Sequence, residues 1–465
     1  MKKLLCMLLT LSLLLILAGC AKADAGINTD APASYDTLDS GLAHTPSDGT
    51  YSEPAYPTDD DAGTSVSTTT YAAATTTVAA TWTVEMEAVA DAIAEASKAA
   101  ASAAAEGAKV PEATMSAPME PGAKPEVQVG AGMLTAGEWK DLENIDFWVK
   151  VLNNNDWYKL MENRGLFANK IVPVKVVDGN GTPCFNVPVS LKNSAGEVIY
   201  KAVSDVDGMA YLLYDLDNKK ESVGRIVVGG AEYDVAAQGQ TVVNLASAGM
   251  SATKLDLLFM IDTTGSMGDE LRYLQAELRD VIRKVAQSGQ SYAINLSVNF
   301  YRDTGDEYVV RSFEFTSDID KAIDQLSQQE SNGGGDYAEA VHLALEDVVK
   351  NHQWRDGAVK LCFMVLDAPP HTAREIAGID DKLQSTVMGM AEQGIRLIPL
   401  ASSGVNTETE FLLRSWAVMT GGTYTFLTNH SGIGNSHLEP TIGEYEVEKL
   451  NDLLVRVICE YCGIK

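Results

Sequence analysis

The chain has 465 residues and a formal net charge of −29 at neutral pH, with 64 acidic and 35 basic side chains. Such a surface repels phosphate backbones and anionic headgroups, which argues against nucleic acid as a partner. Two or three domains are expected at this length. Of the six cysteines, Cys6 and Cys20 lie near the N-terminus, and the other four are too few for a disulfide framework.

The first 20 residues have the pattern of an export signal. Two lysines precede an apolar run, and the run ends in Leu17-Ala18-Gly19-Cys20. This ending resembles the lipobox of bacterial lipoproteins, which implies cleavage before Cys20 and lipid on its sulfur and new amino terminus. The run is shorter than the roughly 20 residues that cross a bilayer; an ordinary signal peptide or a short anchor is the alternative. We expect a signal peptide over residues 1–19 and a lipid-anchored protein on the cell membrane or outer membrane, facing away from the cytoplasm.

Residues 20–130 are predicted to form a low-complexity, flexible stalk. The stretch at 64–83, "TSVSTTTYAAATTTVAATWT", cannot bury enough apolar surface to offset the entropy of ordering it. Residues 84–107 differ, because they have high helix propensity but few large apolar groups. A partly formed isolated helix is favoured there over a partner-binding helix.

The next two segments contain more apolar and aromatic residues. Residues 131–168 are predicted to form short helices that pack against the following domain. Over residues 169–249, Val-rich alternation is broken by turn sequences such as "DGNG" and "DVDG", which is typical of a small antiparallel β-sandwich. This region resembles transthyretin-like or carboxypeptidase-regulatory-like domains. The turn residues Asp178, Asn180, Asp205 and Asp207 suggest calcium, but turn formation explains the same residues.

Residues 253–465 alternate between strand and helix patterns. Strands are expected at 254–261, 292–301, 307–315, 359–366, 395–401 and 423–428. Helical faces are expected at 274–285, 319–326, 338–349, 380–391, 408–419 and 450–461. Such alternation predicts an α/β fold with a mostly parallel sheet and helices on both faces. Ligands of such sheets bind beyond the carboxyl ends of the strands, so the loops after Ile261, Tyr301 and Leu366 are expected to share one edge.

Oxygen-bearing side chains lie in those loops. Asp262, Thr264 and Ser266 occupy every second position directly after the first strand. Asp367 follows a later strand. Carboxylate and hydroxyl oxygens are the ligands that hard cations such as Mg²⁺ prefer. Two carboxylates and neutral hydroxyls would leave such an ion undercoordinated, so that it attracts one more carboxylate from another molecule.

The same residues carry a family resemblance. "FMIDTTGSM", "GGGDYAEAV" and "LDAPPH" resemble bacterial von Willebrand factor type A domains over residues 253–465. The resemblance implies a metal-ion-dependent adhesion site in which Asp262, Thr264, Ser266 and Asp367 hold Mg²⁺, or Mn²⁺ or Ca²⁺. Many relatives place a metal-binding threonine in the middle loop, where this chain has Asp336. Asp336 is predicted to substitute, directly or through water, with helix capping as the alternative.

These features predict a surface lipoprotein that binds a protein partner through the cation. The partner is expected to offer an acidic side chain to the ion. The alternative is a metal-independent scaffold or regulatory envelope protein that assembles through the sandwich and A-domain surfaces. No catalysis is predicted, because "DTTGS" lacks the lysine of phosphorylated-aspartate ATPases, and aspartic proteases need a second such loop. His371 has the chemistry of a base, although a place on the rim or in a turn is favoured.

The remaining cysteines give weaker signals. Cys459 and Cys462 form a single CxxC in the last helix, which is typical of a redox pair or of half a zinc site. A local disulfide between them, or two free thiols, is favoured over zinc. Cys362 lies in a buried strand and is expected in the core, and Cys184 has no assigned role.

Overall fold

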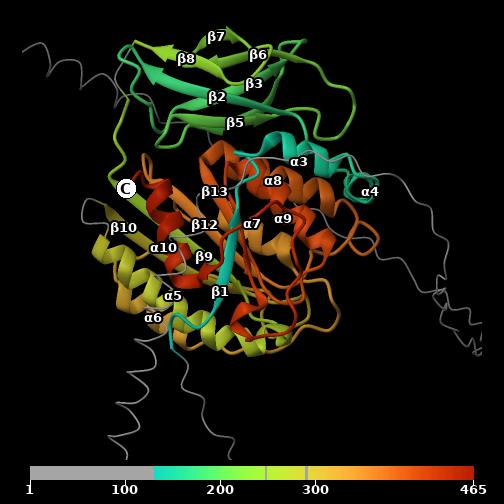
Figure 1. Cartoon of the computed structure of the whole chain (residues 1–465), viewed down its shortest axis with the longest axis vertical. Coiled ribbons are helices and arrows are strands. Elements are labelled where there is room, and N and C mark those ends of the chain that lie inside the picture. Colours follow the sequence, from blue (N-terminus) through green and yellow to red (C-terminus); the bar gives the residue numbers. More distant parts are fainter. Residues whose placement is uncertain (1–129, 247–248, 289–291, 465) are drawn as a thin grey trace, which may run out of the picture. The chain divides into compact units, whose positions relative to one another are not determined.

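A computed structural model describes residues 130–464, apart from 247–248 and 289–291. The predicted signal peptide, the lipidation site Cys20, the stalk and the helix expected within 84–107 lie outside the described residues. The described part contains an eight-stranded sheet covered by helices and a separate β-sandwich (Figure 1). No helix in this part of the chain is both long and apolar enough to span a bilayer.

The large sheet has the strand order β11-β10-β9-β12-β13-β14-β1-β15. Its strands are β1 Thr135–Trp139, β9 Lys254–Asp262, β10 Ala293–Tyr301, β11 Val310–Arg311, β12 Val359–Leu366, β13 Ile395–Ala401, β14 Tyr424–Leu427 and β15 Glu448–Lys449. The five strands from β10 to β14 in this order run parallel, whereas β11, β1 and β15 are antiparallel to their neighbours. The predicted α/β fold with a mostly parallel sheet is confirmed.

Helices cover both faces of this sheet, because alternate residues of the buried strands point to opposite sides. On β9, Leu258 and Met260 belong to the core that includes α7, α8 and α9, whereas Leu257 and Phe259 belong to the core with α5, α6 and α10. The helices are α5 Gly268–Ser288, α6 Ile319–Ser327, α7 Val341–Lys350, α8 Ile379–Gln393, α9 Thr407–Thr420 and α10 Leu450–Tyr461. Short 3₁₀ turns lie at Gly265–Met267 and Asn429–Ser431.

Residues 131–168 differ in part from the prediction. Strand β1 pairs with β14 and β15, and in Figure 1 the cyan strand lies among red elements from the end of the chain. The predicted short helices follow as α3 Ile145–Leu152 and α4 Asn155–Arg164. Their aromatic side chains also pack on the α/β region: the Trp157 ring lies 6.1 Å from that of Phe411 in α9. The sandwich is therefore inserted between two strands of one sheet.

The sandwich consists of a three-stranded sheet, β5-β2-β8, and a four-stranded sheet, β4-β3-β6-β7. Its strands are β2 Ile171–Asp178, β3 Pro188–Asn193, β4 Val198–Val203, β5 Met209–Leu213, β6 Val223–Val228, β7 Ala231–Asp234 and β8 Thr241–Leu245. All pairs are antiparallel except β2 with β8, which run parallel. Asp178 Oδ1 accepts hydrogen bonds from the backbone of Asn180 and Thr182, and Asp205 Oδ1 accepts the equivalent pair, so both aspartates build turns.

The sandwich packs against the helices that cover one face of the large sheet. The buried Tyr200 hydroxyl of β4 donates to the carbonyl oxygen of Met419, at 2.6 Å. Arg396 of β13 donates to the carbonyl oxygens of Val203 and Thr420, at 2.6 and 2.7 Å. Buried hydrogen bonds of this kind fix the relative position of two packed units.

All four cysteines in the described part are free thiols. Cys459 and Cys462 are not joined, which differs from the local disulfide considered above; burial raises the pKa of the Cys462 thiol to about 12. Cys362 is fully buried in β12, as predicted, and Cys184 is buried in the sandwich beside Gly249.

Candidate metal centre

The first loop of the candidate site begins where β9 ends, at the centre of the large sheet. Asp262 is fully buried, and its Oδ1 accepts hydrogen bonds from the Thr264 amide at 2.8 Å and the Thr264 hydroxyl at 2.7 Å. The Thr264 hydroxyl also lies 3.2 Å from that of Ser266. The structure thus brings together the three predicted residues of this loop.

Asp367 reaches the same place from the end of β12, which is the neighbour of β9. It is 3% exposed. Burial raises the pKa of Asp262, and the negative charge of Asp367 raises it further. Burial likewise raises the pKa of Asp367, while a hydrogen bond from Ser266 opposes that rise. The predicted residues Asp262, Thr264, Ser266 and Asp367 therefore lie in one group, in which Ser266 is exposed and the other three are buried.

The glycine loop that precedes α7 adds a carboxylate that the sequence did not single out. Gly265 donates to the carbonyl oxygen of Gly333 at 3.1 Å, which joins this loop to the first. Glu339 is 2% exposed, and its Oε1 lies 3.0 Å from the position that a Cβ would take at Gly334. The same position lies 3.3 Å from Cβ of Thr264, so the Glu339 carboxylate lies beside the first loop.

Three features hold the glycine loop in place. Asp306 accepts hydrogen bonds from the amides of Asp303 and Gly334, at 3.1 and 2.9 Å. Gly333 has φ +80°, and a Cβ there would lie 2.4 Å from the Asp306 carboxylate, so this position requires glycine. The amide of Glu339 donates to the carbonyl oxygen of Pro369 at 3.0 Å, which joins the glycine loop to the loop of Asp367.

The negative charges of Asp262, Asp367 and Glu339 repel one another. Burial raises the pKa of Glu339 to about 9, and the next largest causes are the charges of Asp262, Asp303 and Asp367. Asp262 Oδ2, Asp367 Oδ1 and Glu339 Oε2 are all buried, and none has a hydrogen-bond partner among the described residues. Such buried, unpaired acceptors are costly.

These donors fit a hard divalent cation. Three carboxylates and the hydroxyls of Thr264 and Ser266 offer oxygen ligands only, which is the donor type that Mg²⁺, Mn²⁺ and Ca²⁺ prefer. A cation would satisfy the unpaired oxygens and reduce the repulsion between the charges. Glu339 was missed because its alternation with alanines in "YAEAV" also fits a helix.

Asp336 occupies a different place from the other predicted ligands. It is exposed, and its carboxylate groups with His371 and Glu375. In the described part of the chain, no hydrogen bond joins it to Asp262, Thr264, Ser266 or Asp367. Nor does Asp336 cap α7, whose N-cap residue is Ala340. Its role as a ligand of the first site remains a prediction, and Glu339 supplies the middle-loop carboxylate that the structure brings to that site.

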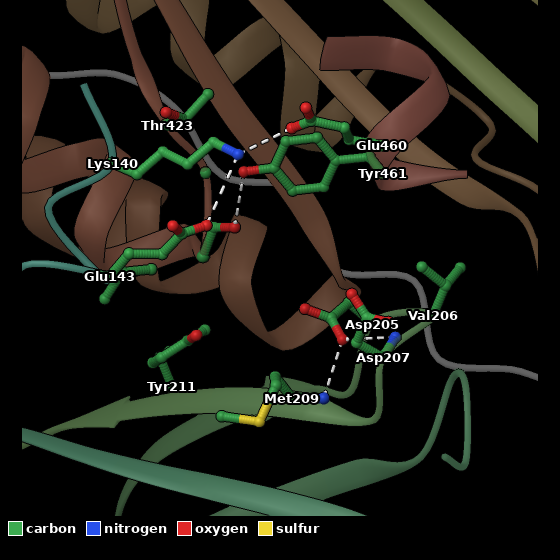
Figure 2. Close-up of a pocket in the computed structure, with 13 residues that line it drawn as sticks. Lys140, Glu143, Asp205, Val206, Asp207, Met209, Tyr211, Thr423, Glu460 and Tyr461 are labelled. Atoms are coloured by element: carbon green, nitrogen blue, oxygen red, sulfur yellow. Dashed lines mark hydrogen bonds and ion pairs between the residues drawn. The ribbon is translucent and has the colours of Figure 1, made fainter. Parts of the chain in front are cut away.

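A separate pocket of about 160 Å³ lies between the sandwich and the α/β region (Figure 2). Lys140 forms ion pairs with Glu143 and Glu460, at 3.5 and 2.7 Å, across its upper side in this view. The Tyr461 hydroxyl donates to the carbonyl oxygen of Gly421, just before β14 begins. The pocket therefore lies near the amino end of β14, whereas Asp262 and Asp367 lie at the carboxyl ends of their strands.

The chain is similar to known proteins over part of its length. A curated protein with similarity to the chain is a putative ariadne-like RING finger protein of Acanthamoeba polyphaga mimivirus, with 32% identity over 120 residues. The match covers 25% of this chain and 11% of that protein, so the chain spans about a tenth of its relative's length. The solved conserved hypothetical protein BatB from Bacteroides thetaiotaomicron has 12% identity and a TM-score of 0.32, over 45% of this chain and 99% of its own.

The family match is more direct. Residues 256–423 match the von Willebrand factor A domain family, a span that begins in β9 and ends just before β14. It includes every residue of the candidate centre. Domains of this family are general protein-interaction modules and often bind divalent metal. The chain therefore contains a von Willebrand factor A domain.

Proposed function

We propose that this A domain binds a protein partner through a divalent cation at a metal-ion-dependent adhesion site. Asp262, Thr264, Ser266 and Asp367 would hold the ion, with Glu339 as a further ligand. The observation that carries the proposal is the convergence of three buried carboxylates, each with an oxygen left unpaired by the described residues. A cation supplies what these oxygens lack.

The partner is expected to offer a carboxylate. Mg²⁺ requires six oxygen ligands, and one oxygen from each of the five residues named above would leave one position that another molecule can fill. Glu339 adds negative charge to the site, which weakens the attraction of the ion for a partner's acid. Affinity for the partner is therefore expected to be moderate, and to rise when Glu339 is neutralised.

We also propose that the domain is displayed at a membrane surface by lipid on Cys20, on the cell membrane or outer membrane. The lipobox "LAGC" and the low-complexity stretch that follows it support this part. Replacing Cys20 by Ala would then release the protein from the membrane fraction. If the variant sediments with membranes as the wild type does, the lipid anchor is refuted. The chain is proposed to be a binding protein and not an enzyme.

Calorimetric titration of the full chain with Mg²⁺, Mn²⁺ and Ca²⁺ tests the metal site. We expect binding by the wild type and none at this site by Asp262→Ala. Equal binding by both proteins, or none by either, would refute the proposal. Cross-linking at the cell surface with and without chelator tests the partner: capture that does not depend on the metal would favour the scaffold alternative. Point variants suit these tests better than domain deletions, because the sandwich is inserted in the sequence between two strands of the large sheet, β1 and β9.

A further inference from the structure

A second group of side chains that can ligate a metal shares no residue with the five of the first site. Asp336 comes from the glycine loop, and His371 and Glu375 come from the segment after β12. One ligand atom of each lies within 4.8 Å of the others. None of these three side chains takes part in the site proposed above.

The imidazole of His371 is held as a metal ligand would be. Its side chain is 9% exposed, and Nε2 lies 2.8 Å from Oδ1 of Asp303. Nδ1 is buried and lacks a hydrogen-bond partner within the described residues, and it lies 3.7 Å from Oε2 of Glu375. In metal sites a histidine commonly bonds a carboxylate through one ring nitrogen and the ion through the other. The unpaired Nδ1 thus lies beside the Glu375 carboxylate, and Asp336 belongs to the same group.

Contacts with neighbouring residues position two of these donors, His371 and Glu375, before any ion binds. Arg164 of α4, which is 4% exposed, donates to the carbonyl oxygens of His371 and Pro370 at 2.9 and 3.1 Å. Glu375 Oε2 accepts hydrogen bonds from the amide and hydroxyl of Thr372, at 2.6 and 2.9 Å.

We propose that Asp336, His371 and Glu375 form a second metal site, which takes a transition metal of the zinc class. An imidazole donor favours such metals over Mg²⁺ and Ca²⁺, which prefer oxygen ligands alone. Three protein ligands leave a fourth position for water on the exposed side, as in open zinc sites. Asp303 positions the imidazole. Asp336 would then serve this site, while Glu339 serves the first.

Zinc titration of the untagged, metal-free full chain tests the proposal. We expect His371→Gln and Glu375→Gln each to weaken zinc binding at least tenfold, and Asp303→Asn to weaken it about 10- to 100-fold, as outer-shell changes commonly do. Asp381→Asn removes an exposed carboxylate six residues after Glu375 that is not part of the group, and it is the matched control, because it should leave zinc affinity unchanged. Asp262→Asn should also retain this zinc site while losing magnesium binding.

Cobalt provides a second readout that does not depend on affinity alone. Co²⁺ bound by the wild type should give visible absorption bands of a low-symmetry site, and these should change in His371→Gln and persist in Asp262→Asn. Zinc binding and cobalt bands that are unaltered in folded His371→Gln and Glu375→Gln would overturn the proposal. Loss of both signals in Asp262→Asn alone would overturn it too, because zinc would then occupy only the first site.

Discussion

The Glu339→Gln substitution is expected to affect stability differently in the metal-free and metal-bound states of the first site. Glu339 is 2% exposed, and burial together with the charges of Asp262, Asp303 and Asp367 raises its pKa from 4.5 to about 9. Near neutral pH the metal-free, folded protein therefore holds this carboxyl protonated. In the unfolded chain the Glu339 carboxyl is ionised at this pH, so folding without metal requires this group to take up a proton.

The size of this effect follows from the linkage between pKa and stability. Because the folded pKa lies above the unfolded one, stability is present at low pH and falls as the pH rises from 4.5 to about 9. Each pH unit in that window costs about 1.4 kcal/mol, which gives an upper limit of about 3 kcal/mol near pH 7. Residual hydration of the loop screens part of this, so we expect about 1–3 kcal/mol. Glutamine carries no charge and avoids this cost.

Thermal unfolding measured with chelator, at about pH 5 and about pH 7.5, tests this reasoning. The variant should melt higher than the wild type at the higher pH, by about 2–4 °C per kcal/mol for a domain of this size. The difference should nearly vanish at the lower pH. With saturating Mg²⁺ the wild type should gain more than the variant, because the ionised Glu339 becomes a ligand; an ion at 100 times its Kd adds about 2.7 kcal/mol.

Glu346→Gln is the matched control. Glu346 lies seven residues after Glu339, and its pKa is lowered, whereas that of Glu339 is raised. Hydrogen bonds from Lys350 and Lys382 lower the pKa of Glu346, so its removal should lower the melting temperature slightly, with or without metal. If Glu339→Gln instead melts lower than the wild type in chelator near pH 7.5, the buried-charge reasoning is wrong. An equal Mg²⁺ response in both proteins would show that Glu339 is not a ligand.

Three further changes test other parts of the molecule. Asp262→Asn should abolish the Mg²⁺-dependent rise in melting temperature; an unchanged rise would place the ion elsewhere. Gly333→Ala should cost at least about 1 kcal/mol, because its Cβ would meet Asp306 at a positive φ, and calorimetry should show weaker Mg²⁺ binding; unaltered stability and binding would contradict the rigid glycine loop. Arg414→Met should cost about 3–5 kcal/mol in denaturant unfolding, since it leaves Asp141 and Glu410 buried without their cation, and a loss below 1 kcal/mol would contradict that pairing.

The central strands were predictable because each is a continuous apolar run. The expected bounds of 359–366 and 395–401 coincide with β12 and β13, and 254–261 falls one residue short of β9. The first-loop ligands were also predictable, since a polar triplet directly after a buried strand must lie at the sheet edge. The expected strand at 307–315 was wrong in extent: only Val310–Arg311 pair regularly with β10. Turn residues and charged side chains there carried no clear period.

The choice between Asp336 and Glu339 could not be made from the sequence. Both lie near the start of the same helix, and an aspartate directly after glycines is the closer match to the family pattern. Their positions are decided by a tertiary contact, in which the Glu339 amide bonds the carbonyl oxygen of Pro369 and residues 339 and 370 form a β-bridge. This contact brings Glu339 beside the first loop and leaves Asp336 near His371. No local spacing encodes a bond between two loops 30 residues apart.

Strand β1 was missed for the same reason, and it leads to one more prediction. A fragment of residues 253–465 matches the predicted A domain but lacks β1, α3 and α4. It would lose the buried Trp148 and Trp157, which pack with Phe411 and Arg414 of α9. Removing each tryptophan costs about 3–5 kcal/mol in comparable cores, and their sum approaches the 5–15 kcal/mol that stabilises a typical protein, as an order of magnitude.

We therefore expect this fragment to be unfolded or aggregated. A second protein that keeps residues 130–168 and replaces the sandwich with a flexible linker should fold better, because it restores the β1–β14 pairing and both tryptophans. Circular dichroism and thermal unfolding of the two proteins give the answer. Cooperative unfolding of the shorter fragment at the wild-type temperature would refute the argument that β1 and its helices belong to the A-domain core. An unfolded shorter fragment beside a folded longer protein would instead mean that the sandwich is an insertion within one folding unit.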